Sequence, residues 1–241
     1  MNTQKLVLST LLLGATAGMA QAQTEAGKVL LSGQVNYQSN DSKESPLNNP
    51  AGVYPNMNTK NKYNQLNFTP QAGFFVANHL AIGLSATIAS TKQNNSYVDY
   101  TGAITPSPYA YTNKNTNTSF SVGPFVRYYK MLGEKFGLYG QLNTGYQRGT
   151  QKYSSDYPNY YPSTTTSNGG YISINPGFVY FPTNKLGLEL TLGSLGYQRG
   201  KSEERSTRPD YISINRSYSS FTTNLSIQYL TVGASFYLGK S

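Results

Sequence analysis

The sequence predicts an all-β fold in which antiparallel strands close into a barrel. The first observation is an alternation of apolar with polar or small residues. Within Pro176–Gly193, leucine occupies every second position from Leu186 to Leu192, a period typical of β-strands. The second is composition: 12% of the 241 residues are charged and 37% are hydrophobic, and the abundant Asn, Ser, Thr, Gly and Tyr favour strands and turns. The third is that short polar turns alternate with long polar segments along the chain.

A repeated hairpin sets the order of the elements. The segments TPQAGFFVANHLAIGLSATI, GPFVRYYKMLGEKFGLYGQLNTGYQ and NPGFVYFPTNKLGLELTLGSLGYQ each contain a proline, an aromatic pair, a short polar turn and an alternating strand. Their prolines, Pro70, Pro124 and Pro176, recur at intervals of about fifty residues, which predicts one hairpin per repeat. Because proline cannot donate a hydrogen bond within a sheet, we expect these positions to mark a bulge or bend.

The alternation predicts eight strands, each with one apolar face. They are Lys28–Ser39, Lys62–Ala77, Leu80–Lys92, Asn117–Lys130, Phe136–Gln151, Gly169–Pro182, Leu186–Gly200 and Ser217–Leu238. Their apolar faces include, in the same order, Leu31, Leu66, Leu84, Val126, Leu138, Ile174, Leu188 and Val232. The last strand changes phase, which predicts a bulge near Gln228–Leu230. The predicted loops are the polar segments Asn40–Asn61, Gln93–Thr116, Lys152–Asn168 and Lys201–Arg216.

The polar face of these strands decides between a soluble and a membrane protein. A soluble sandwich would bury the apolar face and expose the other one to water, but the strand interiors carry essentially two charges, Arg127 and Glu189, whereas soluble surfaces are rich in charge. The opposite arrangement exposes the apolar face to lipid, and the sheet must then close on itself. The pattern therefore predicts an eight-stranded antiparallel transmembrane β-barrel with short periplasmic turns, long external loops and both termini in the periplasm.

Aromatic residues lie near both ends of the predicted strands, where girdles are found in such barrels. Those of the inner girdle are Phe74, Tyr128 and Tyr180, and those of the outer one are Tyr37, Tyr146 and Tyr197.

The first 22 residues are typical of a secretory signal peptide. Lys5 gives a positive start, Leu6–Leu13 is a short apolar core, and Ala20 and Ala22 are the small residues that a signal peptidase recognises. We expect cleavage after Ala22, which leaves residues 23–241 as one outer membrane β-barrel domain. The chain has no cysteine, which excludes disulfides, thiolate metal sites and a lipid anchor on an N-terminal cysteine.

These hairpins resemble those of the small bacterial outer membrane β-barrel family, of the OmpX and OmpA-transmembrane-domain type. The resemblance covers about residues 23–241. It implies outer membrane localisation in a Gram-negative envelope, contact with outer membrane lipids and lipopolysaccharide, and assembly by the barrel-insertion machinery. Family barrels usually end on a phenylalanine that this machinery reads, whereas this chain ends VGASFYLGKS.

The residues predict no catalytic, cofactor-binding or metal site. The single histidine, His79, falls in a predicted turn. Arg127 and Glu189 have the lumen-facing parity and are the candidates for a lumen salt bridge, which is either structural or a gate. An eight-stranded lumen is just wide enough for side chains to fill it, so we expect no open pore.

Outside the membrane, the last loop carries a mildly basic rim, formed by Arg199, Lys201, Arg205, Arg208 and Arg216. Such a rim either contacts lipid phosphates or is simply solvated, and the sequence slightly favours the solvated loop. Loop tyrosines such as Tyr97, Tyr111, Tyr153, Tyr157 and Tyr160 suit an adhesive surface.

We expect an integral outer membrane protein with a structural or surface-interaction role, no catalysis, no cofactor and no nucleic acid partner. The alternatives are a lipid-modifying barrel enzyme, adhesin-like binding of an unknown external ligand by the loops, and a secreted β-sandwich that binds carbohydrate.

Overall fold

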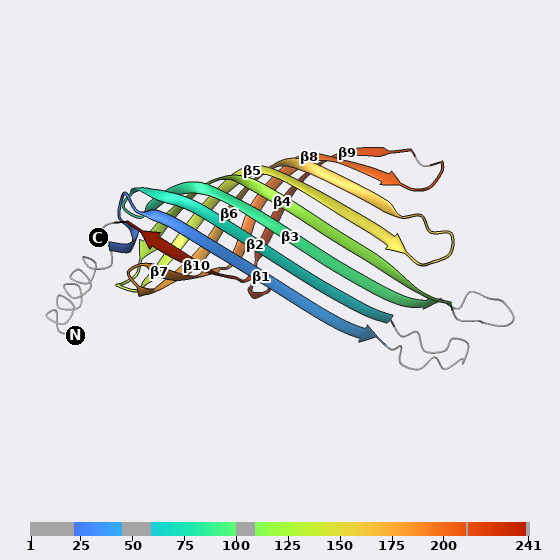
Figure 1. Cartoon of the computed structure of the whole chain (residues 1–241), viewed down its shortest axis with the longest axis horizontal. Helices are drawn as coiled ribbons and strands as arrows, with labels where there is room; N and C mark the ends of the chain where they lie inside the picture. Colours follow the sequence, from blue (N-terminus) through green and yellow to red (C-terminus); the bar gives the residue numbers. More distant parts are fainter. Residues whose placement is uncertain (1–21, 45–58, 100–108, 211, 240–241) are drawn as a thin grey trace, which may run out of the picture.

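The computed structural model describes residues 22–44, 59–99, 109–210 and 212–239, which form strands and two short 3-10 helices (Figure 1). The strands are β1 (Val29–Glu44), β2 (Thr59–Ala77), β3 (Leu80–Asp99), β4 (Tyr109–Met131), β5 (Phe136–Ser155), β6 (Ser163–Thr183), β7 (Leu186–Thr191), β8 (Gly193–Ser206), β9 (Ile214–Leu225) and β10 (Thr231–Leu238). The 3-10 helices are η2 (Ala22–Thr24) and η3 (Ile227–Tyr229). Every strand pair is antiparallel, so the predicted all-β antiparallel fold is confirmed.

Two further findings concern the predicted signal peptide and helices. All of the signal peptide except Ala22 lies outside the described residues, and its cleavage after Ala22 stays a prediction. In the part of the chain that the structure describes, no helix is long and apolar enough to cross a bilayer.

Pairing closes eight of the ten strands into a ring. Each strand from β1 to β6 pairs with the next in sequence, β6 pairs with β7, β7 with β10, and β10 with β1. β8 and β9 continue the sheet beyond this ring, because β6 also pairs with β8 and β8 pairs with β9. The closure by β1 and β10 joins the first and last strands of the chain.

Short and long connections lie at opposite ends of the ring. The β2–β3, β4–β5 and β6–β7 connections are short and lie at the end where β1 begins and β10 finishes (Figure 1). The connections at the other end span residues 45–58, 100–108, 156–162 and 207–213. We call these the inner and the outer end.

The strands extend much further outward than the sequence predicts. The segment Lys152–Asn168, predicted to be a loop, is mostly strand, because β5 continues to Ser155 and β6 begins at Ser163. The other three predicted loops shorten in the same way. Apolar alternation fails to mark these extensions because both of their faces are polar. Threonine and tyrosine still favour extended backbone there, and cross-strand pairs such as the stacked rings of Tyr97 and Tyr111, 5.3 Å apart, hold it in register.

One predicted strand, Leu186–Gly200, is divided into β7 and β8 by a bulge at Leu192. The Leu192 N–H donates to the carbonyl oxygen of Pro176 at 3.0 Å, and Gly193 has a φ of 105° that suits glycine. The expectation that prolines mark bulges thus holds beside Pro176. A bulge is absent at Pro70 and Pro124, where the register is the same on both sides of the proline, and a bend at these two positions stays a prediction.

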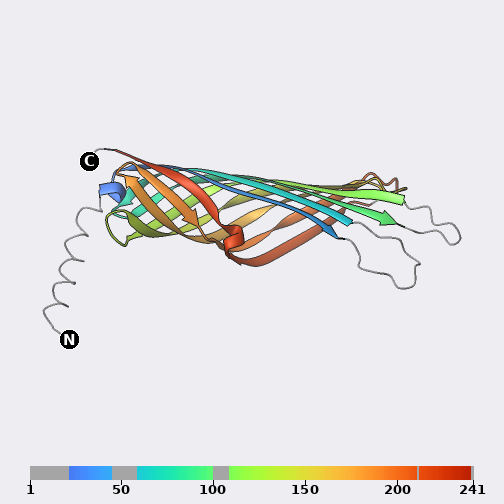
Figure 2. The same ribbon diagram turned by 90° about the horizontal axis from the view of Figure 1, so that it is seen from below.

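The other divided strand is Ser217–Leu238, which η3 separates into β9 and β10 close to the predicted bulge (Figure 2). Thr191 pairs with Thr231 and Gly193 with Leu225. Five residues on one strand therefore oppose the single residue Leu192 on the other. This large insertion redirects the chain at η3, and the predicted count of eight strands becomes ten.

The redirected chain leaves a seam in the outer half of the sheet. β1 pairs with β10 only over Val29–Val35. Beyond that, Asn36–Glu44 of β1 and Ile214–Leu225 of β9 have no pairing with each other. We call these two facing edges the β1/β9 seam.

The apolar faces point outward and the polar faces inward. Leu84 and Leu188 are 64% and 47% exposed, whereas Gln141 and Glu189 are 3% and 2% exposed. The ring therefore has the inside-out distribution that the membrane interpretation predicts, with the leucines on its outer surface and not in its centre.

The seam can be tested by disulfide formation, which requires Cα atoms less than about 7 Å apart. The chain has no native cysteine. With Ser219→Cys on β9, we expect oxidation to link it to Arg199→Cys on β8, its paired residue, but not to Ser39→Cys or Asp41→Cys on β1. Gel mobility after oxidation of the folded protein measures both. An efficient β1–β9 link would show that the seam is closed.

Candidate functional site

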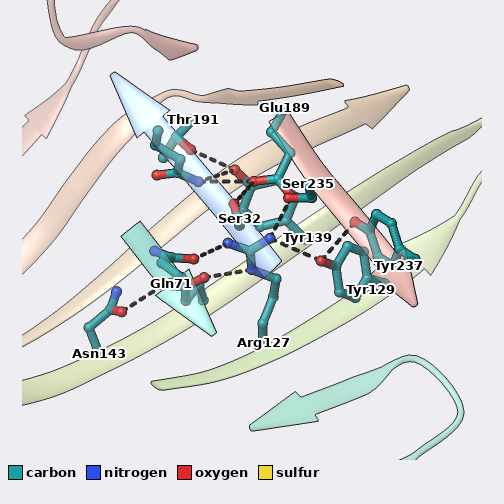
Figure 3. Close-up of polar contacts among 12 residues, drawn as sticks. Ser32, Gln71, Arg127, Tyr129, Tyr139, Asn143, Glu189, Thr191, Ser235 and Tyr237 are labelled. Carbon is teal, nitrogen blue, oxygen red and sulfur yellow. Dashed lines mark hydrogen bonds and ion pairs between the residues drawn. The ribbon is translucent and has the colours of Figure 1, made fainter. Parts of the chain in front are cut away.

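Arg127 lies at the centre of a buried polar network inside the ring (Figure 3). It is on β4, and its guanidinium group donates to Glu189 Oε1 and Gln71 Oε1 at 2.6 Å, to Gln141 Oε1 at 2.5 Å and to the Tyr129 hydroxyl at 2.9 Å. The residue is fully buried. The guanidinium carbon also lies 4.6 Å from the ring centre of Tyr139, a cation–π distance.

Glu189 on β7 accepts hydrogen bonds on both carboxylate oxygens. Oε1 receives Arg127 and the Ser235 hydroxyl. Oε2 receives Gln34 Nε2 at 3.0 Å and, more weakly, the Ser32 hydroxyl at 3.4 Å. These donors come from β10 and β1, which follow β7 around the ring, and from β4 across the interior. The structure thus brings together the two charged residues that the alternation places on the inner face.

The ion pair crosses the interior of the ring, because β5 and β6 lie between β4 and β7 in the sheet. Nη1 of Arg127 and Oε1 of Glu189 are 2.6 Å apart, and neither side chain is exposed. Removing two charges from water costs several kcal/mol per ion, and only good geometry with additional hydrogen bonds offsets this cost. The amide and hydroxyl partners supply those bonds, so the network is a coherent unit and not an isolated pair.

A layer of aromatic side chains fills the ring on the inner side of this network. The ring of Phe75 lies 5.7 Å from that of Tyr129 and 6.0 Å from that of Tyr237, and Phe181 lies 5.1 Å from Tyr237. All four are buried. The buried network and the aromatic layer together occupy the interior of the ring at this level.

The glycines on the inner face make room for these rings. A Cβ atom added to Gly187 would lie 3.0 Å from the ring of Tyr237, and one added to Gly177 would lie 2.4 Å from Cζ of Tyr139. Both approaches are closer than ordinary contacts between carbon atoms. The alternation of leucine with glycine in this part of the sequence therefore reflects an exposed apolar face on one side and an aromatic ring packed against the backbone on the other.

The segment before β1 covers the inner mouth of the ring. Thr24 in η2 is fully buried, and its hydroxyl lies 2.7 Å from Nδ1 of His79 in the β2–β3 turn. The Gln23 amide donates to Asn184 in the β6–β7 turn at 3.3 Å. His79 has a φ of 67°, and its backbone N–H also donates to the Thr24 carbonyl oxygen. His79 is thus a turn residue that fastens η2 to the inner end.

On the outer side of the network lies a polar cavity of about 400 Å³. Its lining residues in the described chain are uncharged, and most are amides or hydroxyls. Gln71 and Gln141 border it near the network, and Asn36 and Asn224 border it at the two edges of the β1/β9 seam. The alternation identifies these residues singly as inward-facing. It gives no sign of the cavity, which depends on how η3 displaces β9.

The predicted basic rim does not form one surface. Arg205 pairs with Glu203 at 2.8 Å, and Arg216 pairs with Glu204 at 2.6 Å. Strand alternation puts the β8 residues Arg199, Lys201 and Arg205 on the outer face together with Tyr197, whereas Arg216 and Glu204 face the opposite side. Arg208 lies in the β8–β9 connection. The hydrogen bond from Arg205 to Glu203 raises the pKa of Arg205.

In the part of the chain that the structure describes, no three His, Cys, Asp or Glu side chains gather closely enough to hold a metal ion.

The network makes a prediction about stability. Arg127→Ala or Glu189→Ala leaves an uncompensated buried charge, and each is expected to cost about 3–5 kcal/mol of unfolding free energy. Arg127→Met with Glu189→Leu is expected to cost less than the two single changes together, because neither charge remains. Urea titration with the folded fraction read from unheated gels measures this.

The matched control is Arg216→Ala, which breaks an exposed ion pair. It is expected to leave the urea midpoint unchanged, because such pairs contribute little. Equal midpoints for Arg127→Ala and Arg216→Ala would contradict a central role for the network.

Comparisons with known proteins give a family. Among solved structures, the chain is similar to a major outer membrane protein of Thermus thermophilus, with 12% identity, a TM-score of 0.44 and coverage of 88% of this chain and 98% of that one. It is also similar to OprG of Pseudomonas aeruginosa, with 12% identity, a TM-score of 0.43 and coverage of 91% and 99%. A third similar structure is Ail of Yersinia pestis, with 11% identity, a TM-score of 0.32 and coverage of 88% of this chain and 99% of that one. No curated protein sequence matches the chain. The family model described as "Outer membrane protein beta-barrel domain" matches residues 8–236, and the chain therefore belongs to this family of bacterial outer membrane β-barrel proteins.

Proposed function

We propose that this protein is an eight-stranded transmembrane β-barrel of the outer membrane with a structural or surface-interaction role and no catalytic activity. The short turns and both termini are periplasmic, and the strand extensions and longer connections are external. Family membership supports the location. The outward apolar faces and the ring of eight strands support the manner of insertion.

The apolar band has the height that an outer membrane requires. On β2 the outward apolar residues run from Leu66 to Val76. At about 3.3 Å per residue and a tilt of 35–45°, this stretch rises about 25 Å, the height of the lipid-facing band in such barrels. The predicted girdle residues Tyr37 and Tyr146 are 65% and 49% exposed at its outer side, and Phe74 and Tyr128 are 49% and 57% exposed at its inner side.

The observation that carries the proposal is the closed inner half of the ring. The Arg127–Glu189 network, the aromatic layer and η2 lie one below another between the external cavity and the periplasmic end. A pore would need all three to move. We therefore assign the ion pair a structural role and not that of a gate, and the protein acts through its external surface.

Conductance measurements test this assignment. In planar bilayers, the wild-type protein is expected to give no current steps. Arg127→Gln with Glu189→Gln is expected to remain silent as well, because the aromatic layer below is unchanged. The heat-dependent gel shift of the same preparation shows that the inserted protein is folded. Regular ion-selective steps from folded wild type would contradict the sealed interior, and steps confined to the double variant would identify the pair as a gate.

A second candidate function is binding of an external ligand in an adhesin-like manner, which tyrosine clusters on the strand extensions favour. Tyr111 stacks on Tyr97 at 5.3 Å and meets the edge of Tyr157 at 4.9 Å, and Tyr153 lies 5.3 Å from Tyr160. Burial raises the pKa values of Tyr153 and Tyr160 above the usual one. Tyrosine is enriched in binding surfaces because it offers a large rigid ring and one polar group.

Replacing the cluster tests this candidate. Tyr97→Ser with Tyr157→Ser is expected to reduce the adhesion of cells that express the protein several-fold, while Tyr180→Ser at the inner girdle leaves it unchanged. Surface amounts of the variants are compared with protease accessibility. Adhesion of the double variant equal to that of wild type would refute the adhesive role.

A further inference from the structure

The polar cavity on the outer side of the buried network has a lining that disfavours ions. In the described chain, every residue that borders this space of about 400 Å³ is uncharged. Beneath Gln71 and Gln141, which form its floor, lie Arg127 and Glu189, whose opposite charges are 2.6 Å apart and fully buried. A charged ligand would therefore enter without a counter-charge, and such a transfer out of water is costly.

The same lining also disfavours apolar molecules. Asn67 on β2 and Asn224 on β9 border the cavity, and neither side chain makes a hydrogen bond among the described residues. The amide of Gln65 accepts a hydrogen bond from the Tyr63 hydroxyl, which leaves its N–H groups for another partner. An apolar ligand would remove these groups from water without replacing their hydrogen bonds, and each unsatisfied group costs free energy.

The wall opposite β2 is held in place by hydrogen bonds of its own. β6 lies opposite β2 in the ring of eight strands, and β5 is its neighbour. Gln141 donates to Asn143 at 2.6 Å, Asn143 donates to Asn175 at 2.9 Å, and Asn175 donates to the carbonyl oxygen of Gly193 at 3.1 Å. These bonds orient three amides before a ligand arrives, and groups that are already ordered lose little freedom on binding.

Small side chains on β3 and β4 leave the space between these walls. Ser85, Thr87 and Ser121 border the cavity there with hydroxyl groups. Two aromatic rings also border it, those of Tyr171 on β6 and Tyr229 in η3, and a tyrosine ring offers a flat apolar face beside a polar group. The volume lies in the range of small-molecule sites, which is room for about one or two sugar rings.

We propose that this cavity binds a small, neutral, polyhydroxylated molecule with the chemistry of a monosaccharide or disaccharide. Each hydroxyl group of such a molecule both donates and accepts, as does each side-chain amide of the lining, and neither side carries a charge. The inference goes beyond the proposed function and rests on it only for the direction of entry. Because the buried network and the aromatic layer occupy the inner half of the ring, the ligand enters from outside and is held there.

Titration calorimetry tests the class of ligand on folded protein in phosphatidylcholine nanodiscs. The probes are glucose, maltose and cellobiose, with glucuronate and glucosamine as charged sugars and cyclohexanol as an apolar ring. We expect saturable heat from at least one neutral sugar, binding of both charged sugars about tenfold or more weaker than that sugar, and no heat from cyclohexanol. Silence with every neutral sugar, or a charged sugar that binds as tightly as the best neutral one, would overturn the proposal.

Two double variants test the lining. Gln65→Met with Asn67→Leu removes two amides at nearly constant volume and is expected to weaken sugar binding on the order of 25-fold, because each hydrogen bond contributes roughly fivefold. The control is Gln151→Met with Asn115→Leu, the same exchanges in an inward-facing amide pair, 3.1 Å apart, that does not border the cavity. It is expected to bind like wild type, and equal affinities for the two double variants would contradict the assigned site.

A third variant tests the space itself. Ser121→Trp places a large ring in the cavity from β4 and is expected to abolish sugar binding, whichever amides hold the ligand. The heat-dependent gel shift shows which variants are folded. Folded Ser121→Trp protein that binds sugar like wild type would place the ligand elsewhere and overturn the site.

The source of the sugar is distinguished by attaching it through its anomeric carbon to a soluble polymer. Binding of the free sugar alone supports a dissolved ligand, and equal binding of the polymer supports the end of a surface glycan; both results support the cavity as the site. Insertion into nanodiscs is recorded separately. A wild type that fails to insert would refute the proposed membrane role, whereas an inserted, folded wild type that binds no neutral sugar would refute this inference alone.

Discussion

The closure of the first strand onto the last is the constraint on which the rest of this structure depends. Within lipid, an unpaired backbone N–H or C=O group costs several kcal/mol, so a spanning sheet cannot have a free edge. β1 and β10 remove that edge over Val29–Val35. Once the ring is closed, one face of each of its strands points outward and the other points to the interior. This is why leucine and glutamine alternate along the same strand.

In its inner half, a ring of eight strands leaves room for side chains and little else, and this shapes the chemistry of the interior. Side chains from opposite walls meet, so Arg127 on β4 reaches Glu189 on β7 without any neighbouring strand between them in space. Large rings fit only where the facing residue is small. A Cβ atom added to Gly83 would lie 2.8 Å from the ring of Phe125. The polar, aromatic and glycine residues of the inner face therefore pack against one another, and a change in one of them affects the others.

Much of this arrangement can be predicted from the sequence, and the failures have a common cause. Alternation identifies the face of a strand wherever that face is apolar, and so it places Arg127 and Glu189 inside and the leucines outside. It predicts the phase change near η3, but not the seam, because the displacement of β9 depends on five residues opposing one across two strands. Alternation also fails to predict the strand extensions beyond the apolar band, where both faces of the strand are polar. Lys114 consequently falls in a predicted loop, and the basic rim is assigned to the β8–β9 segment, where Glu203 and Glu204 neutralise two of its arginines.

The long polar strands hold the side chains of the outer wall at fixed positions, although no hydrophobic core of the described residues lies beneath them. Each extension continues the register that the ring imposes, so Lys62, Asn94 and Lys114 stay in one row although no apolar cluster lies beneath them in the described chain. The same residues on a flexible loop would have to be ordered by a ligand, at a cost of about 0.5–1.5 kcal/mol for each immobilised side chain and more for the backbone. On strands the backbone part of that cost is met during folding. The spacing of side chains on the outer wall is thus set by the register of the sheet, which continues from the closed ring into the strand extensions.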